Sequence, residues 1–129
     1  MPTCGLLSKV KTRKILILED EESSASLYAG VLREAGFEVV VCESFPDARA
    51  CLKSEVPDGL LTDVRVGEYN GLQLVYLFRE LSPAGAVVVA TGHNDHTIRD
   101  EAERLGATFI VKPVDVHSLP KYFASPRNP

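Results

Sequence analysis

The sequence predicts an α/β domain: a doubly wound parallel sheet of five strands with helices on both faces. Short apolar runs alternate with segments of helical periodicity along the chain, which is the order expected for βα units. The runs are continuously apolar, as strands buried on both faces require. With 129 residues, 45% of them hydrophobic and 25% charged, the chain fits a single globular domain.

The expected strands are five runs rich in Val, Ile, Leu or Phe. They cover residues 14–18, 37–41, 59–62, 86–90 and 108–111. Each is four or five residues long and is followed by polar or turn-forming residues, which is typical of a strand rather than of a buried helix.

The first two helices have clear boundaries. The first begins near Glu21, and Gly36 ends it with a positive φ. Its apolar positions, at i, i+3, i+4 and i+7, are Tyr28, Val31, Leu32 and Ala35. The second begins at a capping-box spacing from Ser44 to Asp47, with Pro46 in the first turn. We expect it to bury Ala48, Cys51 and Leu52.

Three further helices follow. The third runs from about Gly71 to Leu81 and the fourth from about Asp95 to Leu105, with Gly106 closing it. Their expected buried residues are Leu74, Val75, Phe78 and Leu81 in the third, and Ile98, Ala102 and Leu105 in the fourth. The fifth follows Pro113 and contains Pro120, so we expect it to be short or broken.

Charged side chains stand directly after three of the strands. Glu19 and Asp20 follow the first, Asp63 the third and Lys112 the fifth. The carboxyl ends of parallel strands meet at one edge of a doubly wound sheet, so these groups should form an acidic pocket with an ammonium beside it. Such a pocket suits Mg²⁺ held against a phosphoryl group. Thr91, after the fourth strand, joins this edge.

Each of these features also has a simpler interpretation. The acids from Glu19 to Glu22 are compatible with a solvated helix N-terminus, and a single Asp after a strand is commonly a cap. Thr91-Gly92 and Lys112-Pro113 are ordinary turn sequences by themselves. Their joint occurrence at four strand ends favours a functional site.

The motifs together resemble the receiver domain of two-component response regulators, from about residue 14 to 122. The resemblance rests on the acidic pair Glu19-Asp20, Thr62-Asp63 with Asn70-Gly71, Thr91-Gly92, and Gly106-Ala107 leading to Phe109 and Lys112-Pro113. It implies a flavodoxin-like sheet with strand order 2-1-3-4-5. It also divides the chain into an extension (1–13), a receiver domain (14–123) and a tail (124–129).

The resemblance implies a role for each matching residue. Asp63 would be the phosphoacceptor, and Mg²⁺ would be bound by Glu19, Asp20, Asp63 and the backbone carbonyl of Arg65. Lys112 would pair with a phosphoryl oxygen.

Two further residues would form the switch. Thr91 would donate its hydroxyl to the phosphoryl group, and Phe109 would move inward as Thr91 shifts. The Lys112-Pro113 bond would be cis. Arg65 and His93, each two residues beyond a site residue, would control water access to the acyl phosphate. Val66-Gly67 departs from the Met-Pro that is frequent in this family, so the loop after Asp63 is expected to be more mobile.

The implied partners are a histidine kinase or histidine phosphotransfer protein and an unidentified downstream protein, with a homodimer possible. The favoured function is a phosphorylation-driven switch that is not otherwise an enzyme; the alternative is a receiver-like interaction module that is independent of phosphorylation. A phosphatase of the haloacid dehalogenase type is disfavoured, because Arg65 stands where that family has its second acid. The chain is either a single-domain regulator or a fragment of a longer one.

Composition excludes several other classes. The net charge of −4 argues against nucleic-acid binding, and we interpret Lys9, Lys11, Arg13 and Lys14 as a solvated cluster. No run is long enough to span a membrane and no secretory signal is present, so we expect a cytoplasmic protein. The three cysteines, Cys4, Cys42 and Cys51, indicate neither a disulfide framework nor a zinc site and are expected to be reduced thiols, the latter two buried.

Overall fold

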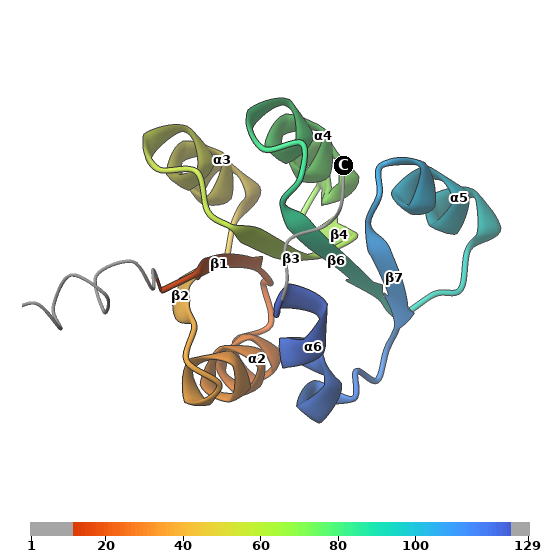
Figure 1. Cartoon of the computed structure of the whole chain (residues 1–129). Helices are drawn as coiled ribbons and strands as arrows, with labels where there is room; N and C mark the ends of the chain where they lie inside the picture. Colours follow the sequence, from red (N-terminus) through yellow and green to blue (C-terminus); the bar gives the residue numbers. More distant parts are fainter. Residues whose placement is uncertain (1–11, 125–129) are drawn as a thin grey trace, which may run out of the picture.

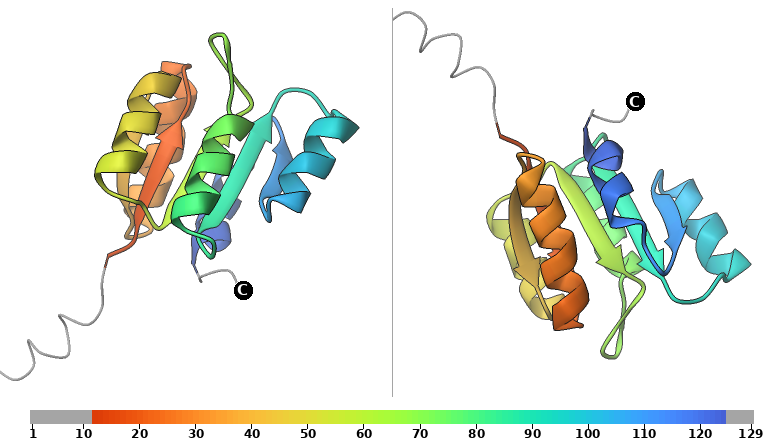
Figure 2. Two further views of the ribbon diagram at one scale, coloured as in Figure 1. Left: turned by 90° about the horizontal axis from the view of Figure 1, so that it is seen from above. Right: turned by 90° about the horizontal axis from the view of Figure 1, so that it is seen from below.

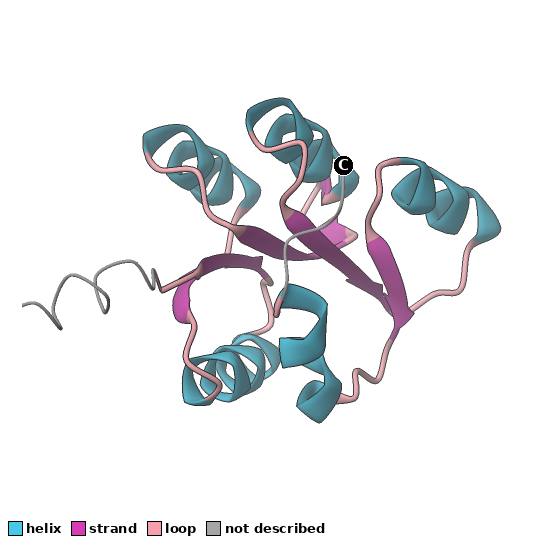
Figure 3. Ribbon diagram, in the orientation of Figure 1, coloured by secondary structure: helices cyan, strands magenta, loops and turns pink. Residues whose placement is uncertain are grey.

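The computed structural model describes residues 12–124, and the expected α/β architecture is present (Figures 1 and 3). Five parallel strands form one sheet in the order β2-β1-β3-β6-β7, which confirms the expected 2-1-3-4-5 order. Their bounds are β1 Lys14–Leu18, β2 Glu38–Cys42, β3 Gly59–Asp63, β6 Ala86–Thr91 and β7 Thr108–Val111. Most of the expected N-terminal extension, the cluster residues Lys9 and Lys11, Cys4 and most of the C-terminal tail lie outside the described residues.

Helices cover both faces of the sheet (Figures 1 and 2). One face carries α3 (Phe45–Ser54), α4 (Leu72–Leu81) and α5 (His96–Arg104); the other carries α2 (Glu22–Glu34), the 3₁₀ helix η1 (Val116–Ser118) and α6 (Leu119–Phe123). Successive residues of a strand point to opposite faces. Accordingly Leu16 and Leu18 pack under the three-helix layer, whereas Ile15 and Ile17 pack under the other.

The expected helix caps are present. The Ser44 hydroxyl accepts a hydrogen bond from the Asp47 N–H, and the Asp95 carboxylate accepts from the N–H groups of Thr97 and Ile98. Gly36 and Gly106 have φ angles of 101° and 74°, as a glycine that ends a helix requires.

Several strand boundaries differ by one residue from expectation. β2 begins at Glu38 because the Phe37 N–H still donates to the Leu32 carbonyl at the end of α2. β3 and β6 each extend one residue further, so Asp63 and Thr91 are the last residues of strands rather than the first residues of loops. A hairpin of β4 (Arg65–Val66) and β5 (Tyr69–Asn70) follows β3 and was not expected.

Some burial predictions were wrong at helix ends. Leu81 is 48% exposed because it is the last residue of α4, and Ala35 is exposed as the C-cap of α2. Cys42 is buried, but Cys51 only partly. The fifth helix is short, as expected, although Pro120 does not interrupt it. Pro120 lies in the first turn of α6, where its missing N–H removes no helical hydrogen bond.

Candidate functional site

Glu19 and Asp20 leave β1 at the carboxyl edge of the sheet. The Glu19 N–H donates to the Cys42 carbonyl (3.1 Å), which extends the pairing of β1 with β2 by one residue. The Glu19 carboxylate accepts from the Glu21 N–H (3.1 Å) and is almost fully buried. Asp20 is exposed, and its Oδ2 accepts from the Gly67 N–H at 3.4 Å.

Asp63 ends β3 beside these two acids. One carboxylate oxygen from each of Glu19, Asp20 and Asp63 lies within 4.8 Å of the other two. The Asp63 Oδ1 accepts from the Arg65 N–H at 3.3 Å, which orients the carboxylate above the strand end. The expected acidic pocket is therefore present.

Gly71 lets the loop after Asp63 pass very close to the strand. Its N–H donates to the Val64 carbonyl at 2.6 Å, and a Cβ at this position would lie 1.9 Å from the Asp63 carbonyl oxygen. No side chain fits there. The glycine of the Asn70-Gly71 pair thus fixes the path of the chain behind the acidic pocket, while the Asn70 side chain accepts from the Leu72 N–H and starts α4.

Lys112 reaches the pocket from β7. Its Nζ donates to Glu19 Oε1 and to Asp63 Oδ2, both at 3.0 Å. The peptide bond between Lys112 and Pro113 is cis, as expected, and the Lys112 N–H donates to the Thr91 carbonyl at 2.7 Å. The ammonium is thus held between two carboxylates that come from different strands.

Burial and pairing set the charges in the pocket. Burial raises the pKa of Glu19 above its usual value, and the hydrogen bonds from the Glu21 N–H and Lys112 offset this only in part. Burial would lower the pKa of Lys112, but its hydrogen bonds to Asp63 and Glu19 raise that pKa well above the ordinary lysine value. The lysine is therefore protonated at neutral pH, and a further cation beside Glu19 would favour the ionised form of its buried carboxyl group.

Thr91 and Phe109 lie on the neighbouring strands β6 and β7. Thr91 is buried, and its hydroxyl oxygen accepts from the His93 N–H at 3.3 Å. Phe109 pairs with Val89 across the strands and is partly buried under the three-helix layer. The Arg99 guanidinium lies over its ring, 5.4 Å from the centroid. Sequence reasoning did not identify Arg99 as a neighbour of Phe109, since no local spacing links residues of α5 and β7.

The comparison with protein families decides the assignment. The response regulator receiver domain model matches residues 15–124. The chain belongs to the response regulator receiver family. This receiver domain is 27% identical over 108 residues to the photosynthetic apparatus regulatory protein RegA of Rhodobacter capsulatus, covering 83% of the chain. It spans only 59% of the length of RegA.

Solved receiver structures share the fold. A CheY-like receiver domain from Methanospirillum hungatei JF-1 superposes with a TM-score of 0.80 at 22% identity, over 86% of this chain and 90% of that one. A response regulator from Burkholderia pseudomallei has a TM-score of 0.76 at 25% identity, over 83% of this chain and 64% of that one. That structure contains a phosphorylated aspartic acid, a calcium ion and citrate.

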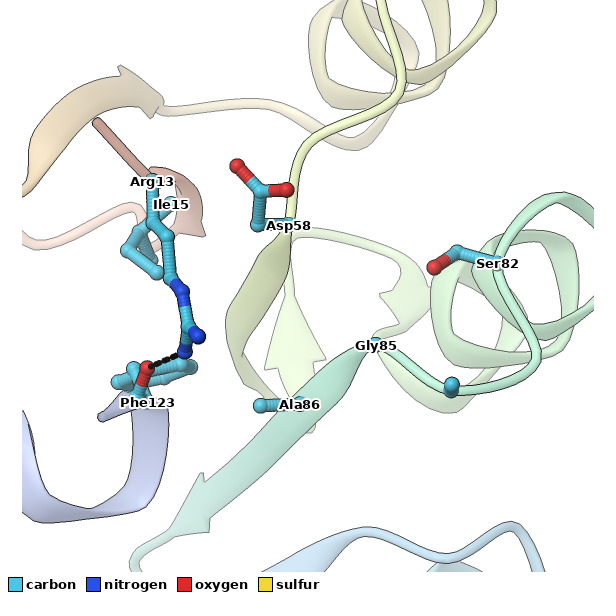
Figure 4. Close-up of a pocket in the computed structure, with 8 residues that line it drawn as sticks. Arg13, Ile15, Asp58, Ser82, Gly85, Ala86 and Phe123 are labelled. Carbon is cyan, nitrogen blue, oxygen red and sulfur yellow. Dashed lines mark hydrogen bonds between the residues drawn. The ribbon is translucent and has the colours of Figure 1, made fainter. Parts of the chain in front are cut away.

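A cavity of about 200 Å³ lies far from the acidic pocket, at the amino-terminal edge of the sheet (Figure 4). Arg13, Asp58 and Phe123 are among its lining residues, and the Arg13 guanidinium donates to the Phe123 carbonyl at 3.0 Å. Because it has none of the residues at the carboxyl edge, this cavity is separate from the receiver site. In the described part of the receiver domain, no helix has the length and apolar character needed to cross a bilayer.

Proposed function

We propose that this receiver domain accepts a phosphoryl group on Asp63 from a phosphohistidine of a histidine kinase or histidine phosphotransfer protein, and that the modification switches its contacts with a downstream protein. The observation that carries the proposal is the arrangement around Asp63. Its carboxylate ends a strand, lies within 4.8 Å of two further carboxylates, and accepts a hydrogen bond from Lys112.

The donor set fits a divalent cation with a preference for oxygen. The carboxylates of Glu19, Asp20 and Asp63 converge. Burial raises the pKa of Glu19 and so disfavours its ionised form, and a cation bound beside it would offset this cost. We assign Mg²⁺ to these side chains and to the backbone carbonyl of Arg65. When bound, the ion would neutralise charge on the carboxylates and on the phosphoryl oxygens.

The transfer step needs no general base from this chain. An ionised Asp63 oxygen attacks phosphorus as the phosphorus–nitrogen bond to the donor histidine breaks, and the bonding electrons stay on that nitrogen. With a proton on its other ring nitrogen, the donor leaves as neutral imidazole, and Asp63 becomes an acyl phosphate. Lys112 is already within hydrogen-bond distance of Asp63 and would pair with a phosphoryl oxygen.

The switch would follow from the same geometry. A phosphoryl group on Asp63 offers new acceptors to the Thr91 hydroxyl, which is buried on the adjacent strand β6. Movement of Thr91 toward the phosphate would leave space that Phe109 enters from β7, away from Arg99. The acyl phosphate would thus favour one of two conformations and alter the surface that partners contact. We place this function in the cytoplasm, where a kinase would supply the phosphoryl group.

The test is the intact mass of the protein after incubation with acetyl phosphate. We expect one phosphoryl addition that requires Mg²⁺ and is absent from Asp63→Ala. The matched control is Glu68→Ala, which removes an exposed acid from the nearby hairpin turn and should be modified normally. A folded, Mg²⁺-loaded protein that takes up no phosphoryl group, from acetyl phosphate or from candidate kinases, would favour an interaction module independent of phosphorylation.

A further inference from the structure

Two cysteines from consecutive elements, β2 and α3, meet between the helix and the sheet. Cys42 is the last residue of β2, and Cys51 lies at the end of the second turn of α3. Their sulfur atoms are 3.6 Å apart, which is van der Waals contact. Neither thiol takes part in the receiver chemistry, so their contact needs a separate account.

The two thiols differ in their access to solvent. Cys42 is buried, whereas Cys51 is half-buried and lines a cavity of about 80 Å³ together with Lys14, Val40 and Glu55. A small oxidant can therefore reach Cys51 more readily than Cys42. Because Cys42 is buried and Cys51 is only partly so, Cys51 is the thiol that meets the oxidant first.

We propose that Cys42 and Cys51 form a reversible intramolecular disulfide when this protein meets a peroxide. The Cys51 thiol loses its proton and the thiolate attacks one peroxide oxygen; the oxygen–oxygen bond breaks, and the hydroxide that leaves takes up that proton to form one water, which gives a sulfenic acid on Cys51. The Cys42 sulfur then attacks the Cys51 sulfur, the sulfur–oxygen bond breaks and a second water leaves. The two thiols lose two electrons and two protons, and the peroxide is reduced to two waters.

The geometry of the contact favours this second step over further oxidation of Cys51. The resolving sulfur already touches the reactive one, and about 1.5 Å of approach converts 3.6 Å into a bond of about 2.05 Å. Cys51 lies on a side of α3 that is only partly buried. Rotation of its side chain and a small shift of α3 can therefore bring the two sulfur atoms to bonding distance. A disulfide of this kind in a cell is expected to be transient and responsive to redox state.

The bond would form next to the acidic pocket without involving it. The Cys42 carbonyl accepts the hydrogen bond from the Glu19 N–H, so the disulfide would fasten α3 to the strand end that positions Glu19. Its formation does not depend on phosphorylation of Asp63, and its test can be read without any phosphoryl donor.

The experiment uses the full chain, reduced and then treated with hydrogen peroxide, with free thiols blocked by N-ethylmaleimide before digestion with trypsin. Cleavage after Arg33, Arg49 and Lys53 places Cys42 in peptide 34–49 and Cys51 in peptide 50–53. We expect these two peptides to be joined, at a mass lower by two hydrogens than their sum, and to separate on reduction with dithiothreitol. Cys4, in peptide 1–9, should be found outside this link.

Variants separate the steps. Cys51→Ser should abolish the linked peptide and leave Cys42 as a thiol, whereas Cys42→Ala should leave a sulfenic acid on Cys51 that dimedone captures. Cys4→Ser should form the link as the natural sequence does. Circular dichroism checks that each variant is folded, and Cys51→Ser, at the half-buried position, provides the test if Cys42→Ala does not fold. The proposal is overturned if Cys51 proceeds to sulfinic acid while Cys42 stays free, if both thiols remain unmodified, or if the link joins Cys4.

Discussion

The Lys112 ammonium donates a hydrogen bond to the Asp63 carboxylate at 3.0 Å, although 49 residues separate them in the chain. The same ammonium contacts Glu19 at 3.0 Å, so it is in hydrogen-bond contact with two of the three carboxylates that we assign to Mg²⁺. In the receiver site, lysine and metal are therefore expected to share ligands rather than to act at separate positions.

Removal of the lysine charge should tighten Mg²⁺ binding. In Lys112→Met the repulsion between ammonium and metal disappears, and about 1 kcal/mol of repulsion corresponds to roughly fivefold in affinity. Isothermal titration calorimetry of Mg²⁺ measures the change. Lys121→Met, at an exposed position on α6, is the control and should bind as the natural sequence does. Weaker binding by Lys112→Met would show that the lysine organises the metal ligands instead of competing with the ion.

Gly71→Ala should destabilise the fold. The added Cβ would lie 1.9 Å from the Asp63 carbonyl oxygen and 2.7 Å from the Thr62 hydroxyl, so the loop must move away from β3. We expect a loss of about 3 kcal/mol in the free energy of unfolding, measured in urea, together with weaker Mg²⁺ binding.

Gly30→Ala is the matched control for this substitution. Gly30 lies inside α2 with no atom within 4 Å of an added Cβ, so alanine there should stabilise by about 0.5–1 kcal/mol. Equal effects of the two glycine substitutions would contradict the steric account of Gly71.

Arg79→Met should also destabilise, because one guanidinium serves carbonyl groups at the ends of two helices. It donates to the Leu105 carbonyl (2.6 Å) and the Gly106 carbonyl (3.1 Å) after α5, and to the Ser82 carbonyl (3.3 Å) at the end of α4. It also donates to the Gly85 carbonyl (2.5 Å) before β6. We expect a loss of about 2–3 kcal/mol on urea unfolding. Arg104→Met, which removes the pairing of an exposed guanidinium with the partly buried Glu101, should change stability by less than about 1 kcal/mol, and a similar loss in both variants would refute the role of Arg79.

Arg65 and His93 should set the lifetime of the acyl phosphate. Both are exposed, and each lies two residues beyond a residue of the site, namely Asp63 and Thr91. Exchange of either for a smaller side chain should admit water more freely and shorten the lifetime, measured as release of inorganic phosphate from the modified protein. An unchanged lifetime in both Arg65→Ala and His93→Ala would discard the idea.

Much of the fold followed from the sequence because its signals are local. Continuous apolar runs located the strands, Ser44 and Asp95 located two helix starts, and Gly36 and Gly106 located two helix ends. The errors lie where tertiary contacts decide. Leu81 has the spacing of the buried residues of α4, but it is the last residue of that helix and its side chain stays exposed.

The residues of the candidate site were found for a related reason. Strand ends of a parallel sheet converge, so Glu19, Asp20, Asp63, Thr91 and Lys112 were expected at one edge without any distance being known. Side-chain contacts between a helix and the sheet could not be predicted in this way. The Arg99–Phe109 and Cys42–Cys51 contacts depend on how a helix is rotated on the sheet, which no spacing in the sequence specifies.

The most direct test of the central claim is to locate the phosphoryl group on the chain. Protein treated with acetyl phosphate and Mg²⁺ is reduced with borohydride, which converts an aspartyl phosphate to homoserine, and then digested with trypsin. Peptide 54–65 contains both Asp58 and Asp63, and its fragment masses distinguish them. We predict homoserine at position 63 alone; homoserine at Asp58, or none in any peptide of a protein that has gained a phosphoryl group, would contradict the assignment of Asp63 as the phosphoacceptor.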